Sequence, residues 1–452
     1  MHNIKDSLYL RDLVVGADTQ IPLGNGEYVP AINFDNAATT PPFFSVLREI
    51  TNFAPWYSSI HRGNGYKSVR SSKVYEDGRE IIKKFVNADS RDIVIYTKNT
   101  TESINMLSYI LFQKDKAQVV LSTDMEHLAN DLPWRDKFKV LYAGTDEHGM
   151  LLLDDLESKL LTYAGKVKLV TVTGASNVTG HINPIYKIAT LAHKYGAKIL
   201  VDGAQLVPHA TINMKPYDSP EHIDYLAFSA HKMYAPFGTG VLIGPQETFS
   251  GVEPVYKGGG DVRLVSREFI EWSNSPAKDE AGTPNILGVV ALISAINTIN
   301  TVGMNVICKY EKQLTNYLIE GLRNIQGVKI YGHRDQNDER VSLISFNVEG
   351  LYHHLLAKML SLEAGIAVRS GLFCAHPYAE KLLNLSKEDL DYYHKHHDIA
   401  LPGLVRASLG LYNQYHEIDI FLSNLDKIIK NKNYYIYKYG KHFPKGTSRK
   451  ER

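Results

Sequence analysis

The sequence predicts an α/β domain with a largely parallel sheet, followed by a smaller α+β domain. From about residue 90 to 245, short β-branched runs alternate with helical patterns. The runs are IVIYT, QVVLS, KLVTVTG, KILVD, IDYLAFS and GVLIG, with helical patterns at 101–112 and 184–196 between them. After GTPNILG the rhythm changes to a long helix, the strands VKIYG, VSLISFNV, IAVR and LVRASL, and helices near 351–363 and 417–430.

The totals of the chain narrow the class of protein. Its 452 residues suit two domains, or one large domain with a smaller companion. Lys plus Arg total 50 against 49 for Asp plus Glu, so no overall field points to nucleic acid or an anionic membrane. Two cysteines, Cys308 and Cys374, cannot form a disulfide framework in a chain of this size. No signal-peptide core is visible, and the longest apolar run, 288–296, is too short to span a bilayer. We therefore expect a soluble, cytoplasmic protein.

An acid and a lysine follow two neighbouring predicted strands. Asp202 ends KILVD, and Lys232 follows the strand IDYLAFS in the segment SAHK. Pyridoxal phosphate needs both groups, because its aldehyde condenses with a lysine and its ring nitrogen stays protonated beside a carboxylate. The nearby segment TGASNVTG has the outline of a dinucleotide site, but its glycine spacing does not match that motif.

Groups suited to a phosphate lie close to this pair in the predicted fold. Ser229 and His231 could donate hydrogen bonds to it, and Thr100 and Thr101 stand where a strand gives way to a helix. Taken singly, Lys232 could be a surface lysine, and Asp202 and Thr101 could be helix caps. Together, the threonines at 100–101, Asp202, the Ser229–His231 segment and Lys232 occur in the order that a pyridoxal-phosphate site requires, and they favour a cofactor site.

At this point the chain resembles the class V aminotransferase group of fold-type I pyridoxal-phosphate enzymes, within it the cysteine desulfurase and selenocysteine lyase branch. The motifs that carry the resemblance run from residue 34 to 413: FDNAATTPP, HRG, NTTESIN, MEHLANDLPW, SNVTG, VDGAQ, SAHK, EAGTPN, RSGLFCAHP and VRASLGLYN. The resemblance implies a mostly parallel seven-stranded sheet in a large domain at 34–288. It implies a small domain made of 1–33 and 289–430, with 431–452 as a basic, tyrosine-rich tail.

The resemblance also implies roles for individual residues. Lys232 would bond to the cofactor aldehyde and move the substrate's α-proton, and Cys374 would attack the substrate's sulfur. Around the cofactor ring, Asp202 would contact the ring nitrogen, Gln205 the phenolic oxygen, and His127 the ring face, where it would also help in proton transfer. The phosphate would be bound by Thr100, Thr101, Ser229 and His231, and by Thr283 from the other subunit of a homodimer. The substrate carboxylate would be bound by Asn177 and Arg406.

Several of these residues have a structural alternative. His127 could be a buried structural histidine, and Arg406 could pair with an acid of the small domain. Asn177 and Gln205 could simply close turns. Arg369 is a second candidate for the carboxylate or one end of a salt bridge. The histidines of HKHHD at 394–398 favour a solvated segment over a metal site, so no metal is expected.

Cys374 follows the strand-like IAVR and a glycine, so a loop could carry it into an electropositive cleft. Cys308 instead lies in a helical pattern typical of core packing. Two features depart from the family pattern: an insertion at 378–403 that could lengthen the cysteine's tether or cover the site, and Phe373 where a histidine is usual.

These observations favour a cysteine desulfurase that makes L-alanine and a persulfide on Cys374 for a sulfur-acceptor protein. The alternatives are a selenocysteine lyase or another C–S lyase, a transaminase that would not need Cys374, and a non-catalytic scaffold. Intact Lys232 and Asp202 argue against the last.

Overall fold

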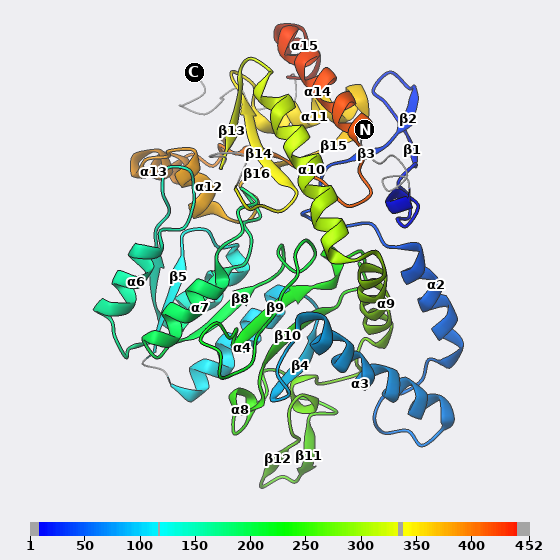
Figure 1. Ribbon diagram of the computed structural model, residues 1–452, viewed down its shortest axis with the longest axis vertical. Helices are drawn as coiled ribbons and strands as arrows, with labels where there is room; N and C mark the ends of the chain where they lie inside the picture. The colour runs from blue at the N-terminus through cyan, green and yellow to red at the C-terminus, as the bar shows by residue number, and fades with distance from the viewer. Residues whose placement is uncertain (1–8, 116–117, 333–337, 441–452) are drawn as a thin grey trace.

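A seven-stranded sheet forms the centre of the computed structural model, which describes residues 9–115, 118–332 and 338–440 (Figure 1). Its strands, in spatial order, are β4 Asp92–Thr97, β10 Gly240–Pro245, β9 Tyr225–Ser229, β8 Lys198–Asp202, β7 Val167–Thr173, β5 Val119–Thr123 and β6 Lys139–Ala143. Only β10 runs antiparallel to its neighbours. The predicted α/β domain with a mostly parallel seven-stranded sheet is therefore confirmed.

Both faces of this sheet are buried, because successive side chains of a strand point to opposite faces. In β9, Leu226 and Phe228 join one hydrophobic cluster, whereas Tyr225 and Ala227 join the other. The first face packs against α3 Tyr66–Val86, α6 Leu153–Thr162, α7 Ile185–Lys194 and α9 Ile286–Val302. The second packs against α4 Thr100–Lys114, α5 Leu132–Arg135 and α8 Gln246–Phe249. Continuous apolar strands such as KILVD thus fit a sheet covered on both sides.

A second, four-stranded antiparallel sheet lies above the first in Figure 1. Its order is β13 Val328–Tyr331, β14 Leu343–Val348, β17 Leu404–Ser408 and β16 Arg369–Gly371. The helices α10 Met304–Arg323, α11 His353–Ala364 and α14 Tyr415–Lys430 pack around it. This is the α+β arrangement expected for the second half of the chain.

The N-terminal segment runs across to this second sheet. A hairpin of β1 Gln20–Pro22 and β2 Tyr28–Pro30 leads into β3 Ile32–Asn33, which pairs in parallel with β15 Ile366–Ala367. Asp35 then bridges Ser408. These contacts join residues 32–35 to the C-terminal part of the chain, and the division into a large domain at 34–288 and a small domain of 1–33 and 289–430 stays a prediction.

The end of the chain forms a helix where only a basic tail was expected. Helix α15 spans Lys432–Tyr439, and Lys438 forms an ion pair with Glu363 of α11 at 2.6 Å. The rest of the predicted tail, 441–452, lies outside the described residues.

The insertion at 378–403 contains the end of α12 His376–Leu382 and all of α13 Lys387–Lys395. Tyr378 is fully buried and donates to the carbonyl of Gly149 at 2.6 Å, and Lys381 Nζ donates to the carbonyl of Thr145 at 2.9 Å. Its far end is held by His353, whose Nε2–H donates to the carbonyl of Leu401 at 3.1 Å. The insertion is therefore docked at both ends.

We expect His353 to make the stability of the protein depend on pH. Burial lowers the pKa of His353 to about 4, so the unfolded chain takes up a proton below pH 6.5 that the folded protein refuses. Folding stability is therefore lost as the pH falls from 6.5 toward 4. His353→Gln keeps an N–H donor for Leu401 but cannot titrate. Between pH 7 and pH 5 its free energy of unfolding, from urea titrations, should improve relative to the native chain by about 2 kcal/mol. An unchanged difference would contradict this account.

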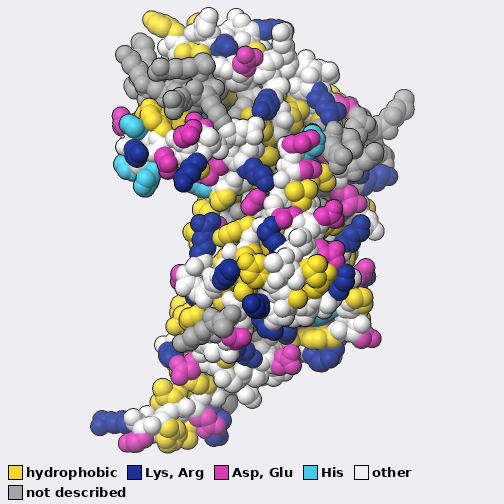
Figure 2. Space-filling view, turned by 90° about the vertical axis from the view of Figure 1, so that its left-hand side faces the viewer, with side chains coloured by type: hydrophobic (Ala, Val, Ile, Leu, Met, Phe, Trp, Pro, Cys, Tyr) yellow, Lys and Arg dark blue, Asp and Glu magenta, His cyan; other side chains and the backbone are white. Residues whose placement is uncertain are grey.

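Two surface features stand out. The hairpin of β11 Val262–Val265 and β12 Ile270–Trp272 projects from the body and exposes apolar side chains at its tip (Figure 2). Histidine side chains gather at the level of α13 in the same view.

Within the described ranges, no three His, Cys, Asp or Glu side chains are placed to hold a metal ion. No single described helix is long and apolar enough to cross a membrane; α9 and α10 reach that length only together, and they are bent by 78°.

Candidate active site

A cavity of about 220 Å³ lies where the carboxyl ends of the parallel strands meet the second sheet. All but one of the predicted site residues line it: Thr100, Thr101, His127, Asn177, Asp202, Gln205, Ser229, His231, Lys232, Arg369, Cys374 and Arg406. The exception is Thr283. The structure thus brings together residues that are more than 300 positions apart in the chain, while the role of each remains a proposal.

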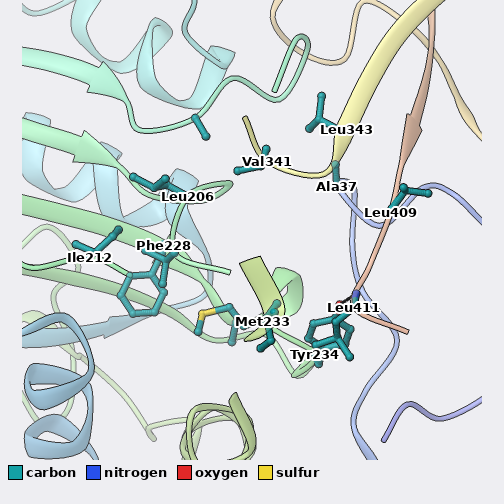
Figure 3. Close-up of a cluster of buried hydrophobic side chains, with 14 of the residues drawn as sticks. Ala37, Leu206, Ile212, Phe228, Met233, Tyr234, Val341, Leu343, Leu409 and Leu411 are labelled. Atoms are coloured by element: carbon teal, nitrogen blue, oxygen red, sulfur yellow. Dashed lines mark hydrogen bonds between the residues drawn. The ribbon is translucent and has the colours of Figure 1, made fainter. Parts of the chain in front are cut away.

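Lys232 ends a short 3₁₀ turn, Ala230–Lys232, directly after β9. The chain then reverses into antiparallel β10 through Tyr234, which has a left-handed φ of 61°. This conformation is held from several sides: Tyr234 stacks on Phe43 with ring centroids 4.3 Å apart, and its hydroxyl accepts from Leu411 N–H at 3.0 Å. Figure 3 shows Tyr234 in the buried cluster with Met233, Phe228 and Leu411. The lysine is therefore fixed at its base by a rigid turn.

The charges of Lys232 and Asp202 are linked. Burial lowers the pKa of Lys232 to about 8; Asp202 opposes this shift, whereas Arg406 adds to it. Burial also raises the pKa of Asp202, which the N–H of Ala204, 3.0 Å from Oδ1, and the charge of Lys232 counteract. A lysine in this state supplies a neutral amine near pH 8, as covalent bonding to an aldehyde requires.

A phosphate would fit at the start of α4. Thr100 N–H donates to Ser229 Oγ at 2.8 Å, and the two hydroxyl oxygens lie 2.7 Å apart. Asn99 caps the helix by accepting from Glu102 N–H at 3.0 Å. A helix N-terminus with adjacent hydroxyls is a suitable anion site. Burial lowers the pKa of the adjacent His231 to about 4, so its ring is neutral at pH 7.

Hydrogen bonds hold both the ring of His127 and the neighbouring residue Glu126. Its Nδ1 accepts from Ala129 N–H at 3.0 Å, so a neutral ring carries its proton on Nε2. Burial lowers its pKa to about 4, with help from the charges of Lys232 and Arg406. The neighbouring Glu126 is buried and accepts from Asn130 Nδ2 at 2.6 Å and from Thr173 N–H at 3.0 Å. This network fixes the backbone from which His127 projects.

Gln205 is buried against the N-terminal segment. Its Nε2 donates to the carbonyl of Ala37 at 2.7 Å, and its Oε1 has no partner within the described chain. The expected hydrogen bond from Gln205 to the phenolic oxygen of the cofactor stays a prediction. The unpaired buried oxygen shows that this wall of the cavity still has polar capacity for a bound group.

Arg406 lies at the opposite end of the cavity and is 3% exposed. It donates to the carbonyl of Asn177 at 2.8 Å and to Asp35 Oδ1 at 3.2 Å, and its Nε has no partner among the described residues. Burial lowers the pKa of Arg406 to about 10, and Asp35 counteracts the shift. Arg369, which is half exposed, reaches the other oxygen of Asp35 at 3.5 Å. Both arginines therefore pair with Asp35, which lies in the predicted large domain and not in the small domain, where the structural alternative placed the partner of Arg406.

Cys374 is exposed and lines the cavity in the loop between β16 and α12. Its φ is 55°, and its carbonyl accepts from Leu128 N–H at 2.7 Å. Cys308 is partly buried in α10, and burial raises its pKa to about 11. Of the two thiols, only Cys374 is placed for chemistry in this cavity.

The insertion does not cover the site, contrary to one of the two expectations for it. None of residues 378–403 lines the cavity, because they dock on the loops that contain Thr145 and Gly149.

Thr283 is exposed and lines a separate cavity with Tyr96 and Glu280. Its segment is anchored by Glu280, which accepts from Arg79 Nη1 and from the hydroxyl of Tyr75, each at 2.7 Å. Thr283 thus lies outside its own chain's Lys232 cavity, as expected of a residue that would serve another subunit.

Sequence reasoning missed three residues: Asp35, Glu126 and Phe373. Asp35 and Glu126 stand inside the quoted motifs FDNAATTPP and MEHLANDLPW. Their place next to other residues of these motifs was the available signal. Phe373 was noted only as a departure, and its contacts could not be foreseen from its position.

The fold and the cavity agree with a known family. A family model described as Aminotransferase class-V matches residues 32–421. The chain belongs to this family.

Known relatives within it are similar over most of their length. A probable cysteine desulfurase of Synechocystis sp. is 35% identical over 409 residues, which cover 89% of this chain and 91% of the relative. A cysteine desulfurase of Haloferax volcanii is 32% identical over 91% of this chain and 93% of its own. The apo structure of a cysteine desulfurase from Thermococcus onnurineus superposes with a TM-score of 0.79, at 32% identity, over 92% of this chain and 98% of that one.

Proposed function

We propose that the protein is a pyridoxal-phosphate-dependent cysteine desulfurase, which converts L-cysteine to L-alanine and leaves a persulfide on Cys374. One observation carries the proposal: the exposed thiol of Cys374 lines the same cavity as the partly buried Lys232 and the buried Asp202. The names of the relatives support the same reaction. A transaminase would need the pair but not the thiol.

The residues present suit the cofactor. Lys232 would bond to its aldehyde, Asp202 would face its ring nitrogen, and the start of α4 with Ser229 would hold its phosphate. When bound, pyridoxal phosphate supplies an electron-withdrawing ring that stabilises negative charge on the substrate's Cα. His127 would lie against the ring face. Its imidazole would be neutral there, because burial disfavours the charged form.

Three side chains of this protein would then bind the substrate, transfer its protons and accept its sulfur. Arg406 binds the substrate carboxylate through its planar donor group. Lys232, with its lowered pKa, takes the proton from Cα and later returns a proton to the product. Cys374 attacks the sulfur of the substrate as a thiolate, so that a new S–S bond forms as the Cβ–S bond breaks. The electron pair of the broken bond goes to Cβ, which is protonated to the methyl group of alanine.

The direct test is mass spectrometry of the Cys374 peptide after incubation with L-cysteine. We expect one added sulfur atom on Cys374 and an equal amount of L-alanine. The peptide of Cys308 serves as an internal control and should stay unmodified, since burial raises its pKa to about 11. Pyruvate with no added sulfur on Cys374 would favour another C–S lyase, and a keto acid formed with retention of sulfur would favour a transaminase. Faster turnover of L-selenocysteine than of L-cysteine would favour a selenocysteine lyase.

The proposal includes a homodimer, a sulfur-acceptor protein and a cytoplasmic setting. The exposed position of Thr283 and the apolar side chains on the β11–β12 hairpin support a second copy beside the first. The exposed Cys374 supports transfer to another protein.

A further inference from the structure

Phe373 touches both candidate ligands of the substrate carboxylate and is bonded to the residue that carries the thiol. Its carbonyl accepts from Asn177 Nδ2 at 2.7 Å, and its ring centroid lies 4.9 Å from the guanidinium carbon of Arg406. We infer that Phe373 is a positioning residue, which orients Arg406 for the carboxylate and ties that site to the loop of Cys374. The inference rests on the proposed function.

The ring contact acts on the arginine. Arg406 is buried, and a desolvated guanidinium gains more from the face of an aromatic ring than an exposed one. Together with Asp35 and the carbonyl of Asn177, the ring leaves the guanidinium little freedom to rotate. The guanidinium, whose Nε has no partner among the described residues, is then held in one orientation. A fixed donor binds a carboxylate with a smaller loss of entropy than a mobile one.

The backbone contact acts on the thiol. Phe373 and Cys374 both have left-handed φ angles, 51° and 55°, which cost free energy in residues other than glycine. Two hydrogen bonds offset that cost: Asn177 to the carbonyl of Phe373, and Leu128 N–H to the carbonyl of Cys374 at 2.7 Å. Since Leu128 follows His127, the loop is bound to the segment that carries the ring-facing histidine.

This arrangement gives Asn177 a different place from the one expected. One of the two hydrogens on its amide nitrogen is already donated to the carbonyl of Phe373, so a carboxylate bound here would take the other hydrogen of the same nitrogen. Occupation of the carboxylate site and the position of the thiol are therefore connected through one residue.

The ring is tested by Phe373→Leu, with Phe373→Tyr as the matched control. Phe373→Leu keeps an apolar side chain without a π face, so we expect KM for L-cysteine to rise about tenfold while kcat stays within about twofold. Phe373→Tyr keeps the π face and should stay within about twofold in both constants. In the double variant with Arg406→Lys, the loss of Phe373 should add little to the effect of Arg406→Lys alone, because both act on the same group. Additive effects, or a loss confined to kcat, would overturn the inference.

The backbone contact is tested without turnover. The rate at which iodoacetamide alkylates Cys374, followed by peptide mass spectrometry in the absence of amino acids, reports the freedom of the loop. Asn177→Ala should raise that rate several-fold, whereas Phe373→Leu, which keeps the backbone bond, should leave it within about twofold. Alkylation of Cys308 in the same samples shows whether the fold has loosened as a whole. An alkylation rate in Asn177→Ala equal to that of the native chain would contradict this part of the inference. This result does not depend on whether Cys374 gains sulfur during turnover.

Discussion

Lys232→Ala is expected to abolish sulfur release and, with it, the exchange of the α-hydrogen of L-alanine with solvent. The amine is the only candidate on the described cavity wall that combines partial burial with a pKa lowered to about 8, and the charge of Asp202 acts on it. Removing a positioned acid–base group costs about 10²–10⁴-fold, and the same amine also makes the bond to the cofactor. We therefore expect a loss of about 10³-fold or more in both reactions.

The exchange is measured in D₂O as deuterium incorporated at Cα, by mass spectrometry. Lys278→Met is the matched control, because Lys278 is likewise buried with a pKa lowered by burial but does not line this cavity. It should keep exchange near the native rate. Exchange that survives in Lys232→Ala would show that another group moves the proton.

Cys374→Ser is expected to separate the two reactions that Lys232→Ala abolishes together. A serine hydroxyl stays protonated at neutral pH and cannot form a persulfide, so sulfur release should fall by about 10³-fold or more. The α-hydrogen exchange should persist within a few-fold, because Lys232, Asp202 and Arg406 are untouched.

The control for this variant is Cys308→Ser. Cys308 lies in helix α10, where its thiol donates to the carbonyl of His209 and does not line the cavity, so both reactions should be retained. A Cys374→Ser variant that releases sulfur at the native rate would contradict the persulfide mechanism. Loss of exchange together with sulfur release would show that the thiol also shapes the proton-transfer step.

The fold could be predicted from the sequence where local patterns agree with the tertiary structure. The strand KILVD and the helix after Asn99 appear at β8 and α4, because buried parallel strands and capped helices leave strong local patterns. The tail was less readable. Its charges and tyrosines resemble a solvated end, yet an ion pair between Lys438 and Glu363 docks it as α15.

The candidate site was predictable in its members but not in its contacts. Motif positions named Asn177 and Arg406 as ligands of a carboxylate, yet nothing local to either shows that Asn177 would bind the loop of Phe373 or that Asp35 would pair with Arg406. These contacts join segments that are 196 and 371 residues apart. Such pairings depend on how the two sheets meet, which no local pattern records.

The pairing of β3 with β15, and of Asp35 with Arg406, has a consequence for synthesis of the chain. The two partners of the ion pair are 371 positions apart, so at about 5–20 residues per second the ribosome needs roughly 20 to 70 s to deliver the second after the first. Between residues 232 and 374 the emerging chain holds Asp202 and Lys232 but lacks the thiol and the arginine. The N-terminal segment stays without its strand partner until the ribosome has added residues 366–367. The thiol can therefore meet the lysine only after the chain has grown from residue 232 to residue 374.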